Sequence, residues 1–373
     1  MTLPADTQIV RTRPYLSVVM VVCNVERFLG EAIESILSQT YREFEFVIVD
    51  FGSTDKSKDI ICGYAARDSR IKLHEIPECG LAGARHQACL LARGQYIAIM
   101  DADDICVPER LAWQVEFLDG HPQVGIVGGQ VELIDASGAS LASSVLLSEV
   151  KLERPVDNND LQTALLSYCP FWQDAVMMRR EAFDKVGGYR AVLVQGEDYD
   201  LWMRIAEHFE LANLNQVVFK YRMHPHQVSV RKRKQQTFCS LSVRASAKLR
   251  RSGNTDPLNS AQAVTLELLK EMGVGEAEVQ SSLAAEFRGW IQFMCAAGEW
   301  NAALKSAREL LRSSDWKFVE TRAVADMYLQ VARLAWEHNR FWMSIVTTGQ
   351  AVLKRPRVAG RPVRLLLQRL GLA

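Results

Sequence analysis

The chain has 373 residues, of which 48% are hydrophobic and 24% charged, an ordinary composition for a soluble globular protein of two or three domains. Its 44 basic and 44 acidic side chains balance, so the net charge points to no particular class of partner. The eight cysteines stand singly, which argues against a zinc site built on paired cysteines.

The sequence also lacks the usual signs of secretion or membrane insertion. No basic-then-apolar signal peptide opens it, and no apolar run reaches the roughly 18 residues needed to span a bilayer. We therefore expect free thiols and a cytoplasmic protein.

The first half of the chain alternates between strand-like and helical segments. Residues 1–14 are polar, and we expect them to form a flexible arm. The predicted strands are "YLSVVMVV" (15–22), "FEFVIVD" (44–50), "IKLHEI" (71–76) and "QYIAIMDADD" (95–104). The predicted helices cover 26–40, 53–67, which opens with capping residues, and 80–94, which Gly94 closes. This alternation predicts a parallel sheet with right-handed crossovers.

The second half is less regular and then becomes helical. We predict helices at 107–122, 181–189 and 196–208, strands at 124–135, 174–180 and 217–224, and an irregular stretch at 136–160. Ala, Leu, Glu and Arg dominate after residue 230, which predicts an all-α domain over 231–353. Segments 296–312 and 337–354 share a turn-aromatic-helix pattern typical of tetratricopeptide hairpins, with an ordinary helical packing domain as the alternative.

Acidic side chains follow two of the predicted strands. Asp50 ends the strand 44–50, and "MDADD" (100–104) ends the strand 95–104. Ligands bind at the carboxyl ends of the strands in such sheets, so these acids are expected on one rim. Asp101 and Asp103 can turn toward one ligand, and hard oxygen ligands suit Mg²⁺ or Mn²⁺ bound to a diphosphate. The alternative is a solvated acidic turn.

Three further positions carry groups that are able to do chemistry. In "GEDYDLW" (196–202), one of the acids is a candidate general base, although acids at a helix N-terminus also act as simple caps. Arg85 in "GLAGARH" is able to pair with a phosphate, or it is a surface charge. His224 in "YRMHPH" follows a strand and is either structural or a ligand for a metal or a phosphate.

Four of these stretches resemble a known family in their order and spacing. They are "SVVMVVCNVERFLGEAIESILSQTY", "FVIVDFGSTDKS", "GLAGARHQACLLARGQYIAIMDADD" and "VGGYR…GEDYDLWMRIA…YRMH". Together they resemble the family 2 inverting glycosyltransferases of the GT-A fold, over roughly residues 15–230. The resemblance implies an α/β domain with a Rossmann-like, mainly parallel sheet flanked by helices, followed here by the all-α C-terminal domain.

The resemblance also implies roles for single residues. The segment from Val21 through Asn24 would line the nucleotide pocket together with the turn at Asp50 and Phe51. Arg85 and Glu197 would lie near the nucleotide-sugar. Asp101 would contact the ribose or the metal, Asp103 and His224 would hold Mn²⁺ or Mg²⁺, and Asp198 would remove a proton from the acceptor hydroxyl. These implied positions are all read from the four motifs.

The implied reaction is a single displacement at the anomeric carbon, with inversion. The donor would be a nucleotide-sugar, a UDP-sugar before others, and the acceptor a glycan or a lipid-linked precursor in surface polysaccharide synthesis. The Gln-x-x-Arg-Trp signature of processive synthases is absent from the sequence, so we expect one sugar to be transferred per encounter.

Three positions depart from the family pattern. Phe51 replaces the second acid of the usual Asp-Asp-Gly-Ser, and Cys79 and His86 replace asparagines. A lost charged hydrogen bond to the base would cost about 1.5–3 kcal/mol. Phe51 would either stack on the base or pack into the core. These departures motivate an alternative function, a catalytically degenerate domain that serves as a binding or scaffold subunit.

The last segment, 354–373, combines six basic residues with the apolar run "VRLLLQRLGL". This pattern favours an amphipathic helix lying on the inner face of the plasma membrane as a peripheral contact. The alternative is a basic tail packed on its own domain. No aromatic-basic interleaving or recognised motif indicates a nucleic-acid partner.

Overall fold

The fold is described from a computed structural model. It describes residues 14–142, 153–225, 227, 232–299 and, further on, 301–303, 305, 328–329, 331–333, 335–336 and 340–354. The chain forms two compact units. The first comprises 1–132, 152–221 and 261–263, and the second comprises 133–151, 222–260 and 264–373. The domain division predicted at residue 230 stays a prediction, and all of the predicted arm but residue 14 and all of the predicted tail but residue 354 lie outside the described residues.

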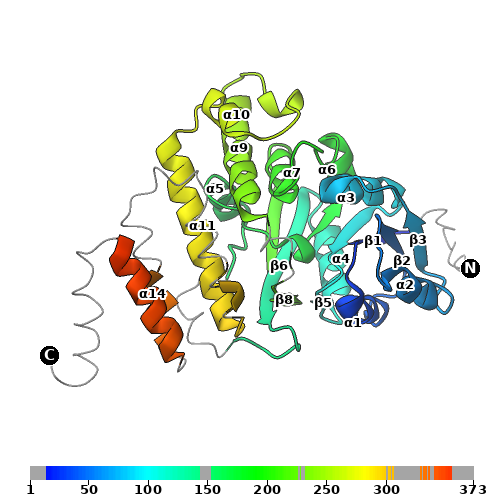
Figure 1. Cartoon of the computed structure of the whole chain (residues 1–373). Helices are drawn as coiled ribbons and strands as arrows, with labels where there is room; N and C mark the ends of the chain where they lie inside the picture. The colour runs from blue at the N-terminus through cyan, green and yellow to red at the C-terminus, as the bar shows by residue number, and fades with distance from the viewer. Residues whose placement is uncertain are drawn as a thin grey trace, which may run out of the picture. The chain divides into compact units, whose positions relative to one another are not determined.

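The described residues form an eight-stranded mixed sheet in the order β3-β2-β1-β4-β7-β6-β8-β5 (Figure 1). Strands β3, β2, β1 and β4 pair in parallel, and β7 joins β4 in the antiparallel sense. The strands are β1 (Leu16–Val22), β2 (Phe44–Asp50), β3 (Ile71–Glu75), β4 (Tyr96–Met100), β5 (Ile105–Cys106), β6 (Val124–Ile134), β7 (Met177–Arg179) and β8 (Glu210–Arg222). The predicted parallel half is therefore confirmed.

The register places the expected acids at one edge of the sheet. Val22, at the end of β1, is the partner of Asp50 at the end of β2. Met20 in β1 is the partner of Met100, the last residue of β4. Asp50 and the acids after Met100 therefore leave the sheet on the same rim, as the parallel arrangement requires.

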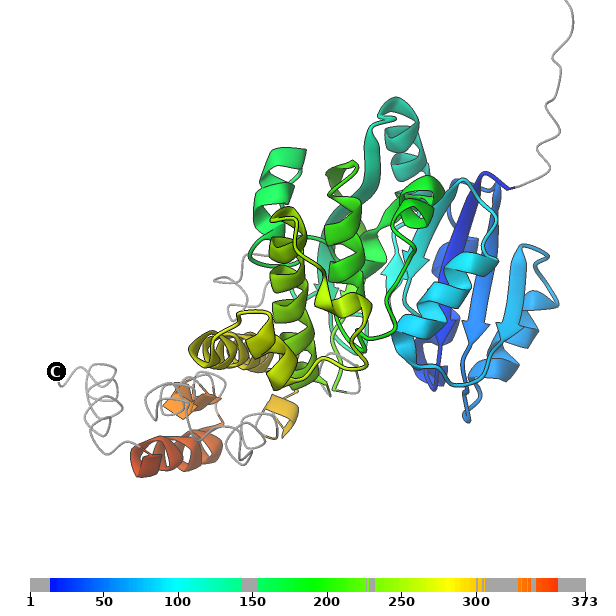
Figure 2. The ribbon, with the colours of Figure 1, turned by 90° about the horizontal axis from the view of Figure 1, so that it is seen from above.

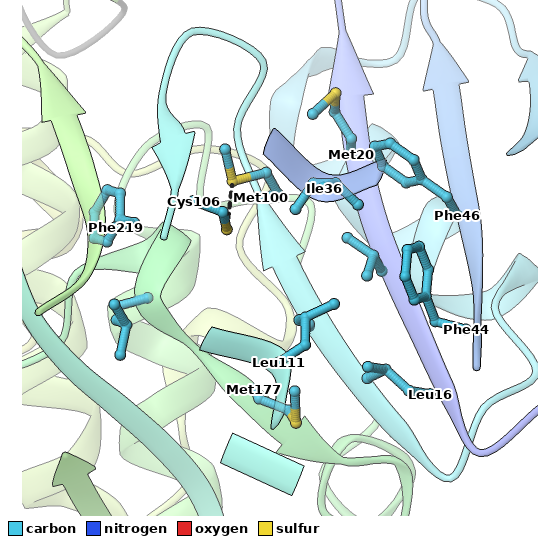
Figure 3. Close-up of a cluster of buried hydrophobic side chains, with 14 of the residues drawn as sticks. Leu16, Met20, Ile36, Phe44, Phe46, Met100, Cys106, Leu111, Met177 and Phe219 are labelled. Atoms are coloured by element: carbon cyan, nitrogen blue, oxygen red, sulfur yellow. Dashed lines mark hydrogen bonds between the residues drawn. The ribbon is translucent and has the colours of Figure 1, made fainter. Parts of the chain in front are cut away.

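Helices cover both faces of the parallel strands. Alternate side chains of β1, β2 and β4 join α1 (Glu26–Leu37), α2 (Ser57–Ala65) and α4 (Arg110–Gly120) in one buried hydrophobic core (Figure 3). Helix α3 (Gly80–Leu91) contributes nothing to that core and packs on β1 and β2 from the opposite face. Figure 2 shows α3 lying across these strands. The near-continuous apolar strands of the sequence reflect this burial on two faces.

The remaining helices of the first unit follow the sheet's irregular half. They are α5 (Asn158–Leu165), the short 3-10 helix η2 (Gln173–Ala175), α6 (Arg180–Lys185) and α7 (Glu197–Ile205). Helix α5 begins inside the stretch 136–160 that was predicted as irregular. The strand predicted over 174–180 is shorter, because η2 occupies its first residues and β7 begins only at Met177.

Two predicted helix ends are wrong for identifiable reasons. Helix α3 ends at Leu91, and Gly94 serves packing instead, since a Cβ there would lie 2.5 Å from the backbone nitrogen of Ser17. Helix α2 begins at Ser57 and not at Ser53. The carboxylate of Asp55 accepts a hydrogen bond of 2.9 Å from the Ser57 backbone N–H and one of 3.0 Å from that of Glu26. Residues 53–55 are thereby committed to a turn.

The second unit is mainly helical in its described part, as predicted. Its helices are α9 (Arg233–Arg251), η3 (Pro257–Asn259), α10 (Leu266–Glu271), α11 (Glu276–Ala296) and α14 (Phe341–Lys354). Most of 296–312 lies outside the described residues, so the tetratricopeptide-like pairing stays a prediction. In the part of the chain that is described, no helix is both long and apolar enough to cross a membrane.

Candidate functional site

The turn after β2 is built on the carboxylate of Asp50. Its Oδ1 accepts hydrogen bonds from the backbone N–H groups of Gly52, at 3.0 Å, and Ser53, at 2.9 Å. Gly52 has a φ of 105°, which a residue with a side chain rarely adopts. Oδ2 of Asp50 is buried and has no hydrogen-bond partner among the described residues. One oxygen thus shapes the turn, and the other is left without a partner among the described residues.

Asn24 ties the end of β1 to the same turn. Its side-chain oxygen accepts hydrogen bonds from the Thr54 backbone N–H at 2.8 Å, the Thr54 hydroxyl at 3.1 Å and the Asp55 backbone N–H at 3.3 Å. Of the described non-glycine residues, Asn24 alone has a positive φ, 55°. Asparagine tolerates this conformation better than most residues. The pocket-lining role predicted for Asn24 and for the buried Val21 stays a prediction.

Phe51 lies between Asp50 and this turn. Its backbone N–H donates to the carbonyl oxygen of Val22 at 3.1 Å, which continues the sheet by one residue. The side chain is half-buried and does not belong to the buried core of the first unit. The core-packing alternative therefore finds no support, and the ring is partly open to a ligand.

Arg85 is buried and joins two of the predicted acids. Its Nη2 donates to both carboxylate oxygens of Asp101, at 2.6 and 2.7 Å, and its Nη1 pairs with Glu197. Burial disfavours the charged guanidinium, but the two carboxylates more than offset it and raise the pKa of Arg85 further above its usual value. The surface-charge alternative for Arg85 is therefore wrong. Arg85, which belongs to α3, thus links Asp101, directly after β4, to Glu197 at the start of α7.

A second acid pair lies beside Asp101. The buried Asp174 of η2 makes a side-chain hydrogen bond with Asp104. Burial, and next the charges of Asp101 and Asp104, raise the pKa of Asp174 well above its usual value. Two carboxyl groups at hydrogen-bond distance share a proton, because both cannot be ionised in a buried place. Asp103 is half-buried in the turn after β4.

The acids at the start of α7 have different surroundings. Burial, and next the charge of Glu197, raise the pKa of Asp198 to about 6. Asp200 is instead held by Arg190, whose Nε donates to Oδ2 at 3.0 Å, and by Arg204, whose Nε donates to the same oxygen at 2.9 Å. Asp200 is therefore structural, and the general-base role of Asp198 stays a prediction.

A divalent metal fits these residues only together with a ligand. Among the described residues, no three His, Cys, Asp or Glu side chains gather as a ready-made metal site. Mg²⁺ and similar ions are commonly held by one or two carboxylates plus substrate phosphates, so the half-buried Asp103 beside Asp101 suits such a shared site. His224 belongs to the second unit, where it is buried and its backbone N–H donates to Oε1 of Gln227 at 3.3 Å. Its metal role stays a prediction.

The sequence motifs missed two residues of this region. Asp174 was assigned to a strand, although an acid directly before the apolar "AVMM" could have marked a buried carboxyl group. Cys169 is the other: burial raises the pKa of its thiol, and the nearby Asp198 carboxylate adds to the effect. The two residues that stand in place of the family's asparagines have different surroundings. The ring of His86 packs on Phe183, with centroids 5.9 Å apart, whereas Cys79 is exposed just before α3.

Known proteins similar to this chain indicate its family. A family model described as "Glycosyl transferase family 2" matches residues 17–187. EpsE of Bacillus subtilis (strain 168) is 36% identical over 214 residues, which are 56% of this chain and 73% of EpsE. WfaP of Escherichia coli, a UDP-Glc:alpha-D-GlcNAc-diphosphoundecaprenol beta-1,3-glucosyltransferase, is 30% identical over 222 residues, which are 59% of this chain and 82% of WfaP.

A solved structure shows the same fold. It is the mannosyltransferase PcManGT from Pyrobaculum calidifontis in complex with GDP-Man and Mn²⁺, with a TM-score of 0.51 and 18% identity over 92% of this chain and 87% of that one. The likeness confirms the predicted GT-A fold. With the family match and the relatives above, it leads to one conclusion: the chain belongs to glycosyltransferase family 2.

Proposed function

We propose that this glycosyltransferase is metal-dependent, inverting and non-processive, and that it moves a sugar from a nucleotide-sugar to a glycan or lipid-linked acceptor in surface polysaccharide synthesis. One observation carries the proposal. The Arg85 guanidinium pairs with Asp101 at the end of β4 and with Glu197 at the start of α7. That bridge keeps Asp198 close enough to Asp101 for the two charges to interact.

Asp198 would act as the general base. A pKa of about 6 leaves its carboxylate mostly ionised at neutral pH, yet basic enough to take a proton in the transition state. The carboxylate would accept the proton of the acceptor hydroxyl, whose oxygen forms the new bond to the anomeric carbon. The bond from that carbon to the diphosphate oxygen breaks at the opposite side, and its electron pair leaves with the nucleoside diphosphate. The configuration is inverted.

Asp103 and Asp101 would hold Mn²⁺ or Mg²⁺ together with the donor diphosphate, and the metal role of His224 stays a prediction. When bound, such an ion supplies Lewis-acid stabilisation of the charge on the leaving group. The carboxylates of this rim and the Mn²⁺ present with the similar mannosyltransferase support this assignment. Metal dependence is common in family 2 enzymes of this fold.

The donor and acceptor are proposed from relatives and from the turn at Asp50. WfaP takes UDP-Glc and a diphosphoundecaprenol-linked sugar, and it is 30% identical to this chain. Oδ2 of Asp50 is buried and has no partner among the described residues, and it would accept the imide N–H of a uracil base in place of the acid that Phe51 replaces, so we propose a UDP-sugar donor. A lipid-linked acceptor would require work at the cytoplasmic face of the membrane, with the basic segment 354–373 as the proposed peripheral contact.

Binding and turnover test this function separately. A series of UDP-, GDP- and dTDP-sugars with Mn²⁺ should include one donor that raises the unfolding temperature, because a ligand of the folded state stabilises it. Transfer to a lipid-linked acceptor should require the metal and stop in Asp103→Ala and in Asp198→Ala. NMR of the product should show the inverted anomer. Near wild-type turnover in either variant contradicts the assigned role.

The same experiments address the scaffold alternative. Calorimetric titration with UDP and Mn²⁺, and with GDP and Mn²⁺, should give metal-dependent binding if the chain is an enzyme. If no nucleoside diphosphate binds, Phe51, Cys79 and His86 mark a domain that has lost its donor site, and the scaffold function replaces the proposed one.

A further inference from the structure

The segment between α5 and η2 borders the region between the proposed base and the metal-binding acids. At one end, Cys169 lies close enough to Asp198 for that carboxylate to raise the pKa of its thiol. At the other end, Asp174 hydrogen-bonds to Asp104. On the proposed function, residues 169–174 therefore connect the surroundings of the base Asp198 with those of the acids after β4. None of the motifs of the sequence includes this segment.

An arginine with no carboxylate partner among the described residues lies against this segment. The guanidinium carbon of Arg154 is 4.9 Å from the ring centroid of Trp172 and 5.6 Å from that of Tyr168. Its Nε is buried and has no hydrogen-bond acceptor among the described residues, which also give it no ion pair. Burial lowers the pKa of Arg154, and the charges of Cys169 and Tyr168 offset only part of this effect.

The backbone of Arg154 is nonetheless firmly placed. Its N–H donates to Oε1 of Gln130 at 2.9 Å, and its carbonyl oxygen accepts from Nε2 of the same side chain at 3.1 Å. Gln130 belongs to β6, so the sheet itself positions the arginine. A cation that the fold positions but leaves without a counter-ion is costly unless a ligand completes it.

The aromatic neighbours of Arg154 offer a surface for a sugar or its substituent. Trp172 packs against Tyr221 with ring centroids 5.2 Å apart, and its Nε1 is buried without an acceptor among the described residues. Tyr168 is 41% exposed, so this cluster opens to solvent. Two buried donors without acceptors among the described residues, one on Arg154 and one on Trp172, thus lie in one aromatic cluster whose outer member, Tyr168, is exposed.

We propose that Arg154, Tyr168 and Trp172 form an acceptor subsite that binds an anionic group, a phosphate or a carboxylate, next to the sugar that receives the transfer. The inference rests on the proposed function, because Asp198 defines where the acceptor hydroxyl lies. Guanidinium groups bind phosphate and carboxylate through paired, charge-assisted hydrogen bonds. The subsite would select charged acceptors over neutral ones with the same sugar.

Direct binding tests the subsite without turnover. The protein is saturated with UDP and Mn²⁺, or with GDP and Mn²⁺, to fill the donor site. It is then titrated with three kinds of probe: the 1-phosphates of glucose and N-acetylglucosamine, methyl glucuronide, and the neutral methyl glycosides. We expect at least one anionic probe to bind ~10-fold or more tightly than its neutral counterpart, as expected for a charge-assisted hydrogen bond. Which anionic probe binds distinguishes a phosphate from a carboxylate.

Variants assign that preference to Arg154. Arg154→Gln should abolish it and Arg154→Lys should restore part of it, because the charge returns without the paired geometry. Arg67→Gln is the matched control, since Arg67 also lies over a tyrosine, 4.8 Å from the Tyr64 centroid, but shortly before β3 at the opposite edge of the sheet. It should keep the preference of the wild type.

Two outcomes overturn the inference. One is a wild-type protein that binds no anionic probe better than the neutral ones, and the other is an Arg154→Gln variant that keeps the preference. If the preference depends on Arg154 but no donor is ever turned over, the proposed enzyme function fails while the anion site remains. The two failures are therefore distinguishable.

Discussion

Arg85 in α3 donates from Nη2 to both carboxylate oxygens of Asp101, at 2.6 and 2.7 Å. The same guanidinium pairs with Glu197, 112 positions further along the chain. Arg85 is buried, so it neutralises two acids that would otherwise repel each other beside Asp198. The organisation of the acids around Asp198 therefore depends on this one cation.

Arg85→Met should destabilise the fold by about 3–5 kcal/mol, because breaking a buried ion pair leaves uncompensated charge. Urea unfolding at pH 7 measures the change. The loss should shrink in the double variant Arg85→Met/Glu197→Gln, which removes one of the stranded carboxylates. Arg67→Met, at an exposed position in the turn after α2, should change the free energy of unfolding by no more than about 0.5 kcal/mol. An Arg85→Met protein as stable as the wild type would contradict this account of the bridge.

Asp198→Asn and Asp200→Asn should have opposite effects, although the two residues are neighbours. Asp198→Asn should reduce the rate of transfer by about 10²–10⁴-fold, the usual contribution of a general base. Asp200→Asn should instead destabilise the protein by about 3–5 kcal/mol, because Arg190 and Arg204 lose their buried partner. Initial rates and urea unfolding on both variants separate the two roles.

The stability of Asp198→Asn at neutral pH gives a second check. The pKa of Asp198 is raised from 3.8 to about 6, so its ionised form is less favoured in the folded state than in the unfolded one. This penalty is absent below pH 3.8 and complete above about pH 6. Asp198→Asn should therefore be more stable than the wild type at pH 7, by up to about 3 kcal/mol, and equally stable near pH 3.5. A destabilised variant at pH 7 would argue for a structural role.

The rate of transfer should fall in acid as Asp198 takes up a proton. With a pKa of about 6, kcat/KM should be nearly constant above pH 7 and should decrease about tenfold per pH unit below about 6. Initial rates from pH 4.5 to 8.5 at saturating Mn²⁺ measure this profile. The stability of the protein is measured at each pH as a control. An inflection near pH 4 would mean that Asp198 has the ordinary pKa of an aspartate and would contradict this prediction.

Asp50→Asn should weaken UDP binding about 10–150-fold, the equivalent of about 1.5–3 kcal/mol for a lost hydrogen bond to a charged group. The amide keeps an oxygen for the N–H groups of Gly52 and Ser53, so the turn should survive. Calorimetric titration with UDP and Mn²⁺ measures the affinity. Unchanged binding would mean that Oδ2 of Asp50 does not face the base.

Phe51→Asp tests the aromatic that departs from the family pattern. An added carboxylate should strengthen UDP binding relative to GDP if it meets the imide, whereas loss of a stacking surface should weaken both nucleotides. Phe51→Leu, which removes the ring without adding charge, is the matched comparison. If neither variant alters the affinity for UDP or GDP, the half-buried ring has no part in donor choice.

The sequence by itself determined the parallel half of the sheet and the rim on which the acids lie. Strand and helix periodicities are local, so 44–50 and 95–104 identify their strands without knowledge of any partner. Asp50 and Asp101 follow directly because parallel strands end on one edge. The boundaries of α2 and α3 were less accurate, since Asp55 and Gly94 are committed to contacts with segments distant in sequence.

Only the tertiary structure decided what each side chain does on that rim. It buried Arg85 between Asp101 and Glu197 and paired Asp104 with Asp174. It also gave Asp200 two arginine partners, and it raised the pKa of Asp198 by burial. It also placed Arg154 between two aromatic rings without a carboxylate among the described residues. Charge and burial act through space, and the partners are tens of residues apart, so no local pattern in the sequence contains them.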